Sequence, residues 1–147
     1  MRTDKNSYYL GIAEAVLRRS TCIRRKYGAV IVKDDEIIST GYNGAPRGWE
    51  NCCDGGYCVR EREGIPHGER YEFCKSVHGE ANAIISASRR DMIGATLYLA
   101  GQESDGSTLL NPEPCAMCKR LIINAGIKKV ITQSGIVNVC DWKGGCN

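Results

Sequence analysis

Residues 78–132 read HGEANAIISASRRDMIGATLYLAGQESDGSTLLNPEPCAMCKRLIINAGIKKVIT, and their periodicity sets the topology of the chain. Apolar residues at helical spacing predict helices over 78–90 and 115–124. Short apolar runs predict strands over 95–100 and 127–132. Because crossovers between strands of one sheet are right-handed, this alternation predicts two parallel strands with helices packed against them.

The part of the chain before this stretch adds a helix and a hairpin. Apolar residues at helical spacing predict an amphipathic helix over 4–19, with Asp4 as its N-terminal cap. Two apolar runs, 28–33 and 36–41, are separated by Asp34-Asp35, which suits a tight turn. The fold class is therefore α/β, with an antiparallel hairpin at the edge of the parallel strands.

Residues 43–77 differ from their surroundings. They contain six glycines, four cysteines, two prolines and one histidine, with little periodicity. A structureless loop of this length is rare inside a compact domain unless something else holds it. Residues 1–147 are expected to form a single domain with a cysteine-rich insert at about 43–77, and the last fifteen residues are expected to be an irregular tail.

Composition excludes several classes of protein. The chain has 147 residues, is 42% apolar and 25% charged, and carries a formal net charge of +3. These values are typical of a globular domain and indicate neither a nucleic-acid nor a membrane partner. The chain has no apolar run long enough to span a membrane, and its N-terminus does not resemble a signal peptide. We therefore expect a cytoplasmic protein, in the cytoplasm of a host if the source is viral.

The nine cysteines are the unusual feature of this composition. In a reducing compartment, clustered cysteines are better explained as metal ligands or catalytic groups than as disulfides. Cys115 and Cys118 are three residues apart on a predicted helix, so both sulfurs can reach one ion. With His78 they make three ligands, a number typical of a catalytic zinc that keeps its fourth position for water. Glu80, two residues beyond His78, is placed to carry a proton to or from that water.

The combination of these motifs resembles the cytidine deaminase superfamily and, within it, the deoxycytidylate (dCMP) deaminase branch. The likeness covers nearly the whole chain and rests on residues 28–33, 38–46, 78–84 and 111–118. The Gly-Tyr-Asn-Gly block at 41–44, together with the cysteine-bearing insert, points to the dCMP branch. The resemblance implies a cytidine-deaminase-like three-layer α/β/α sandwich with a mixed five-stranded sheet.

The resemblance also implies an activity, the hydrolytic deamination of dCMP to dUMP and ammonia, which supplies the precursor of dTMP. A zinc-activated water would attack C4 of cytosine, and Glu80 would carry its proton to N3 and then to the departing ammonia. Asn43 matches the position that holds the sugar in this superfamily. Backbone groups near Gly79 would contact the edge of the base.

Residues 18–26 hold five cations in nine positions and are candidates for binding the substrate phosphate. Arg24 is the first choice because the family often has Cys-x-Arg here, and Arg25 and Lys26 follow it. The alternative is a solvated helix end with no role in binding.

A second metal site is expected near the insert. Several cysteines lie outside the catalytic motif, and thiolate-rich sets of this kind typically hold a structural zinc. We expect Cys22, Cys52 and Cys74 as ligands, with Cys58 or His67 completing the site. Free buried thiols are the alternative. The sequence suggests no role for Cys140 and Cys146.

The resemblance further implies a homo-oligomer, with a hexamer favoured. It also implies dCTP and dTTP as effectors, with Mg²⁺ accompanying a triphosphate effector. Two other functions stay open, a tRNA adenosine deaminase and a non-catalytic zinc-binding module. The insert and the modest charge oppose the first. Glu80 opposes the second, because a structural zinc needs no carboxylate beside it.

Overall fold

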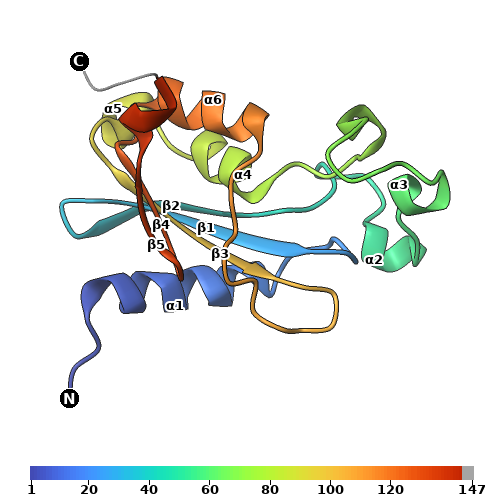
Figure 1. Cartoon of the computed structure of the whole chain (residues 1–147), viewed down its shortest axis with the longest axis horizontal. Helices are drawn as coiled ribbons and strands as arrows, with labels where there is room; N and C mark the ends of the chain where they lie inside the picture. Colours follow the sequence, from blue (N-terminus) through green and yellow to red (C-terminus); the bar gives the residue numbers. More distant parts are fainter. Residues whose placement is uncertain (144–147) are drawn as a thin grey trace.

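The structure is a computed structural model, and it describes residues 1–143. A five-stranded mixed sheet of strand order β2-β1-β3-β4-β5 lies between helices (Figure 1). Its strands are β1 (Lys26–Lys33), β2 (Glu36–Tyr42), β3 (Thr96–Gln102), β4 (Lys129–Thr132) and β5 (Gly135–Asn138). The β3–β4 pair is parallel, as predicted, and the other neighbouring pairs are antiparallel.

Helices cover both faces of the sheet. Helix α1 (Lys5–Leu17) packs on one face, and α4 (Gly79–Ile85), α5 (Arg89–Met92) and α6 (Ala116–Ala125) lie on the other (Figure 1). This arrangement confirms the predicted three-layer α/β/α sandwich. None of the helices in residues 1–143 is long and apolar enough to cross a membrane.

Alternation along the central strands produces two separate cores. In β3, Leu97 and Leu99 pack toward α4 and α6, whereas Tyr98 and Ala100 pack toward α1. Strand β1 alternates in the same way, so both of its faces are buried. Because side chains of a strand point to opposite faces in turn, a nearly continuous apolar run is what a strand between two helical layers requires.

The turn chemistry of the N-terminal half follows the sequence closely. Asp4 caps α1, and its carboxylate accepts a hydrogen bond from the backbone N–H of Ser7 at 3.0 Å. Asp34 and Asp35 both have positive φ, 51° and 63°, between β1 and β2. This conformation is typical of the two-residue hairpin turn that matches the twist of the flanking strands.

The predicted helix over 78–90 is wrong in its extent, because the chain breaks it into α4 and α5. Ser86 ends α4, and Ser88 has extended backbone at the start of α5. The hydroxyl of Ser88 donates a hydrogen bond to Asp91 at 2.9 Å. Serines compete with the helical backbone in this way and favour helix ends, so the break follows from local chemistry that periodicity does not show.

The expectation of an irregular tail is also wrong. Residues 135–138 form β5, which pairs antiparallel with β4, and η2 (Val139–Lys143) follows as a short 3₁₀ helix. All four residues of β5 are exposed. An edge strand with no buried face has no alternation of apolar and polar residues, so the sequence could not reveal it.

The insert contains short helices rather than a structureless loop. These are α2 (Cys52–Gly55), α3 (Val59–Arg62) and the 3₁₀ helix η1 (Tyr71–Phe73). The two ends of the insert meet where Gly44 and Val77 exchange backbone hydrogen bonds. Inside it, the Arg60 guanidinium donates hydrogen bonds to the carbonyl oxygens of Pro66 and Glu69. Backbone pairing and one buried cation therefore hold this segment in place.

Candidate active site

Two helix starts meet on one face of the sheet. His78 is the N-terminal cap of α4, Cys115 is the cap of α6, and Cys118 lies in the first turn of α6. The packing of α4 against α6 and β2 brings them together. Gly41 of β2 permits this approach, since a Cβ there would lie 2.3 Å from the backbone nitrogen of Ala83 in α4.

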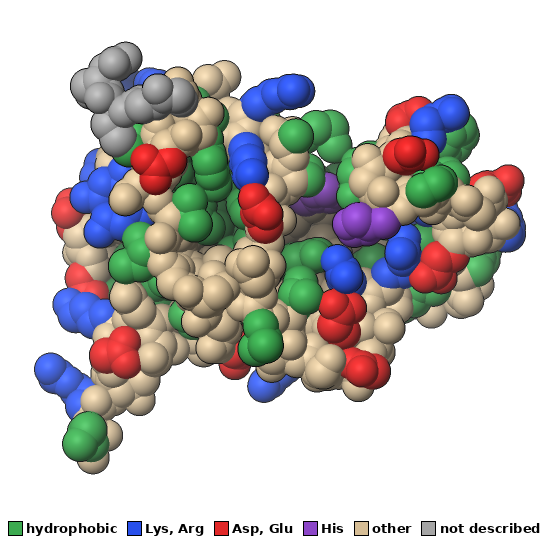
Figure 2. All heavy atoms as spheres, viewed as in Figure 1, with side chains coloured by type: hydrophobic (Ala, Val, Ile, Leu, Met, Phe, Trp, Pro, Cys, Tyr) green, Lys and Arg blue, Asp and Glu red, His purple; other side chains and the backbone are tan. Residues whose placement is uncertain are grey.

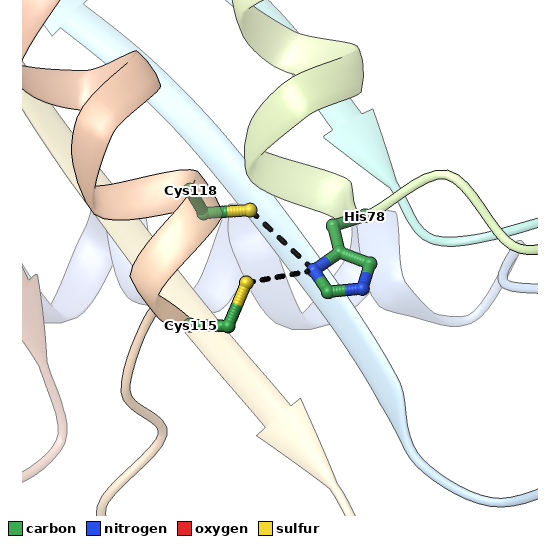
Figure 3. A group of neighbouring side chains, drawn as sticks. All are labelled: His78, Cys115 and Cys118. Atoms are coloured by element: carbon green, nitrogen blue, oxygen red, sulfur yellow. Dashed lines mark hydrogen bonds between the residues drawn. The ribbon is translucent and has the colours of Figure 1, made fainter. Parts of the chain in front are cut away.

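The three predicted ligands converge in the structure. His78 Nδ1 lies 3.4 Å from Cys115 Sγ and 3.4 Å from Cys118 Sγ (Figure 3). Among residues 1–143, this is the group whose potential ligand atoms all lie within 4.8 Å of one another. A tetrahedral zinc with Zn–N of about 2.0–2.1 Å and Zn–S of about 2.3 Å separates nitrogen and sulfur by about 3.6 Å. The spacing of these side chains therefore fits a zinc ion.

The electrostatics of the three side chains also suit a metal cation. Hydrogen bonds from the Cys118 thiol and from His78 lower the pKa of Cys115 to about 3. The bond to Cys115 and burial raise the pKa of Cys118, so the two sulfurs share one negative charge. The contact with Cys115 also raises the pKa of His78. Both sulfurs sit at the start of α6, where free backbone N–H groups favour a thiolate.

Glu80 is a buried carboxyl group beside these ligands. It lies in the first turn of α4, is 4% exposed, and contacts the thiol of Cys118. Burial raises the pKa of Glu80 above the usual value for a glutamate. A carboxyl group of this kind can hold a proton and release it during a reaction.

A cavity of about 400 Å³ opens onto the three ligands and Glu80. Figure 2 shows the two histidines, in purple, next to the hollow in this face of the molecule. The cavity size is in the range of small-molecule sites. Of the residues predicted from the sequence, it is lined by Cys22, Arg24, Arg25, Asn43, Cys58, His67, Cys74, His78, Glu80 and Cys115.

Asn43 lines the cavity, and most of the hydrogen-bonding capacity of its side-chain amide is already used by other groups of the protein. It is 6% exposed, and its Oδ1 accepts hydrogen bonds from Ser20 Oγ at 2.6 Å and from the backbone N–H of Tyr27 at 2.8 Å. Its Nδ2 donates to the carbonyl oxygen of Arg25 at 2.8 Å. An amide nitrogen has two N–H groups, so one remains for a ligand. Gly79 is buried at the start of α4, next to this asparagine.

The three predicted phosphate contacts are not equivalent in the structure. Arg24 and Arg25 both line the cavity, but each is paired, Arg24 with Glu61 at 2.9 Å and Arg25 with Glu103 at 3.2 Å. Lys26 instead lines a separate cavity, which Arg24 also lines.

The thiols predicted to bind a second metal are neighbours but do not form a tight cluster. Burial raises the pKa of Cys52 and of Cys74, and the nearby thiols of Cys22 and Cys58 add to the effect. Cys22, Cys52, Cys58 and Cys74 are all free. The expectation against disulfides does not hold throughout, because Cys140 is disulfide-bonded. Cys146 lies outside the described residues.

Among the cavity-lining residues that sequence reasoning missed, three lie in the insert, namely Arg60, Tyr71 and Ser76. Arg60 packs over the ring of Tyr71 at 4.5 Å, and that ring meets His78 edge-on, with centroids 6.0 Å apart. All three lie in the insert, where no periodicity shows which side chains face inward. The Cys-x-Arg spacing from Cys58 to Arg60 is the only available signal, and it repeats the spacing from Cys22 to Arg24.

Known proteins are similar to this chain in sequence and in fold. Residues 3–134 match the family model of the cytidine and deoxycytidylate deaminase zinc-binding region. A deoxycytidylate deaminase of Mycobacterium phage D29 is 42% identical over 135 residues, which cover 88% of this chain and 94% of the phage protein. A deoxycytidylate deaminase of Schizosaccharomyces pombe is 35% identical over 132 residues, covering 88% of this chain but 37% of the yeast protein.

A solved structure agrees with the sequence comparisons. The dCMP deaminase of cyanophage S-TIM5, crystallised in complex with dCMP and dUMP, superposes with a TM-score of 0.62 at 26% identity. The match covers 90% of this chain and 82% of the cyanophage chain. The family match over residues 3–134 and the similarity to the phage enzyme show that this chain belongs to the cytidine and deoxycytidylate deaminase family.

Proposed function

We propose that the chain catalyses the hydrolytic deamination of dCMP, in which dCMP and water give dUMP and ammonia. The observation that carries the proposal is the convergence of His78, Cys115 and Cys118 beside the buried carboxyl group of Glu80, in a cavity of about 400 Å³. The relatives named deoxycytidylate deaminase, and a related structure that contains dCMP and dUMP, support this choice of substrate.

His78, Cys115 and Cys118 would hold the zinc, as their spacing and shared negative charge allow. Zinc bound by three protein ligands lowers the pKa of a water in the fourth position toward neutrality and so supplies a nucleophile at physiological pH.

The chain's own residues have distinct tasks in this reaction. Glu80 accepts one proton from the attacking water and delivers it to N3 of the base, where it remains in dUMP. It then accepts the second proton of that water, from the hydroxyl group now on C4, and delivers it to the amino group, which leaves as ammonia. The remaining N–H of Asn43 is free to bind the sugar, and the backbone beside Gly79 lies next to it for the base edge.

Arg24 is proposed to contact the substrate phosphate at the cavity. Its side chain is 33% exposed, and its partner Glu61 is 55% exposed. Exposed ion pairs contribute about 0–1 kcal/mol, so a phosphate can replace Glu61 at little cost.

The two alternative functions fit the structure less well. Against a tRNA adenosine deaminase, Arg24 and Arg25 at the cavity are paired with Glu61 and Glu103 rather than forming a basic surface. Against a purely structural zinc module, Glu80 is buried beside the ligands, where a structural site would gain nothing from a carboxyl group.

We also propose a second, structural zinc held by Cys22, Cys52 and Cys74, with Cys58 or His67 as the fourth ligand. The mutual influence of the four thiols supports it, and Cys22, Cys58, His67 and Cys74 all line one cavity. Metal analysis of the purified chain should give two zinc ions per chain. A content of one, with a full catalytic site, would rule the second site out.

The substrate proposal is tested by incubating the zinc-loaded chain with dCMP, dCTP, deoxycytidine and a tRNA anticodon stem while ammonia release is measured. We expect dCMP to be the preferred substrate. Release from the tRNA stem alone would identify the adenosine deaminase, and no release from any of the four would leave the zinc-binding module.

A further inference from the structure

Two buried side-chain polar atoms among residues 1–143 have no hydrogen-bond partner, Nε of Arg60 and Oγ of Ser76. Both residues line the cavity that holds His78 and Glu80. Buried polar groups are nearly always paired in folded proteins. Two unpaired donors at one cavity therefore indicate that a polar ligand belongs there.

Arg60 carries a buried positive charge that no carboxylate in residues 1–143 pairs. It is 5% exposed, and its Nη2 donates hydrogen bonds to two carbonyl oxygens, of Pro66 at 2.9 Å and of Glu69 at 2.7 Å. None of the ion pairs formed within residues 1–143 includes Arg60. Burial of an unpaired guanidinium is costly, and an anion entering the cavity would remove that cost.

The position of Arg60 relative to the metal ligands suits one end of a nucleotide. The ring of Tyr71 separates the guanidinium from the imidazole of His78, with a guanidinium-to-ring distance of 4.5 Å and a ring-to-ring distance of 6.0 Å. A base placed at His78 and Glu80 would therefore have Arg60 one aromatic ring away. That separation leaves room for a sugar between the base and an anionic group.

Ser76 faces the same cavity because of the extended chain that leads into α4. Cys74 and His78 both have extended backbone, and Val77 between them pairs with Gly44. In an extended segment, side chains two positions apart point to the same side. The hydroxyl of Ser76 therefore shares the orientation of the His78 ring.

We propose that Arg60 and Ser76 form the subsite that receives the phosphate group of the nucleotide substrate. This inference rests on the proposed function and assigns the phosphate a partner within the insert. The guanidinium donates one charge-assisted hydrogen bond through its Nε–H, and the serine hydroxyl donates one more. Arg24 and Arg25 are paired with carboxylates, whereas within residues 1–143 no carboxylate forms an ion pair with Arg60.

The test compares dCMP with deoxycytidine, which lacks only the phosphate. The variants are Arg60→Gln, Arg60→Lys and Ser76→Ala, with Arg62→Gln as the control, because Arg62 lies on the same helix and is exposed. The readout is the ratio of kcat/KM for dCMP to kcat/KM for deoxycytidine. Both substrates are measured on one preparation, so the ratio does not depend on how much of the protein is folded.

We expect the ratio to fall about 10–100-fold in Arg60→Gln and about 3–10-fold in Ser76→Ala, and to stay unchanged in Arg62→Gln. Arg60→Lys keeps the charge but loses the planar guanidinium group, so its ratio should lie between those of the wild type and of Arg60→Gln. An equal loss on both substrates would overturn the proposal. If the variant lost zinc as well, the result would instead indicate that the main role of the Arg60 charge is to lower the pKa of the nearby Cys74 thiol.

A measurement on the wild-type chain covers the case in which the Arg60 variants do not fold. The Nε–H resonance of Arg60, assigned through its contact with the Tyr71 ring, should shift on addition of dUMP and not of deoxyuridine. A resonance unmoved by dUMP would contradict the subsite. A wild-type chain that deaminates neither substrate would refute the proposed function, and this resonance would still report on the subsite.

Discussion

Ser20 donates a hydrogen bond of 2.6 Å from its hydroxyl to Oδ1 of Asn43, and both side chains are buried. The same oxygen accepts the backbone N–H of Tyr27, and the amide nitrogen donates to the carbonyl oxygen of Arg25. The segment after α1 and the first strand thus fix the orientation of the asparagine before any substrate arrives. Because the amide of Asn43 is already oriented, little free energy is spent on ordering it when the substrate binds.

Replacement of Ser20 by alanine tests this arrangement. Ser20→Ala should cost about 1 kcal/mol of unfolding free energy and raise KM about 3–10-fold, because Asn43 is then less well oriented. The sugar is common to dCMP and deoxycytidine, so KM should rise equally for both. A rise confined to dCMP would show that Ser20 acts on the phosphate instead.

The role of Glu80 is tested by Glu80→Gln, which keeps the shape of the side chain but cannot accept or release a proton. We expect kcat to fall by at least about 100-fold, as is typical when a general acid–base is removed. Zinc content, measured by metal analysis, should stay at the wild-type value, because Glu80 is not one of the three ligands. Retention of activity would disprove the proposed role.

Substitution of single cysteines by serine should distinguish the zinc ligands from the other cysteines. Cys115→Ser should lose the catalytic zinc and all activity, whereas Cys53→Ser should keep both, since Cys53 is exposed and free. A chelator should inactivate the wild-type chain, and added zinc should restore it. If Cys115→Ser kept its full zinc content, the assignment of this thiol as a ligand would be wrong.

Gly41 should be irreplaceable for a steric reason. A Cβ there would lie 2.3 Å from both the Ala83 nitrogen and the Gly79 carbonyl oxygen, so Gly41→Ala should cost about 1–3 kcal/mol as α4 is pushed from β2. Gly11 in α1 is the control, because a Cβ added there would have nothing within 4 Å. Gly11→Ala should stabilise the chain by about 0.5–1 kcal/mol. Thermal denaturation of both variants measures the difference.

Arg24→Ala should raise KM for dCMP about 3–10-fold and leave KM for deoxycytidine within about twofold, because a paired arginine contributes less than an unpaired one. Arg19→Ala is the matched control from the same basic segment, since Arg19 is exposed and does not line the cavity. Steady-state kinetics on both substrates decide the outcome. Equal changes for the two substrates would exclude a phosphate contact for Arg24.

The sequence predicted those parts of the molecule whose signal is local. The central strands are apolar on both faces, and the metal-ligand candidates stand at helix starts with fixed spacing, so both could be recognised without the fold. Strand β5 could not, since its residues are exposed and it forms only by pairing with β4. Arg60 and Ser76 could not either, because no periodicity in the insert shows which of its side chains line the cavity.

The most direct test follows dUMP and ammonia together when the zinc-loaded chain is incubated with dCMP, with Glu80→Gln as the paired control. We predict equal amounts of the two products from the wild-type chain and a rate at least about 100-fold lower from the variant. No dUMP from a wild-type chain that carries its full zinc, or equal rates from the two proteins, would contradict a deaminase built on His78, Cys115, Cys118 and Glu80.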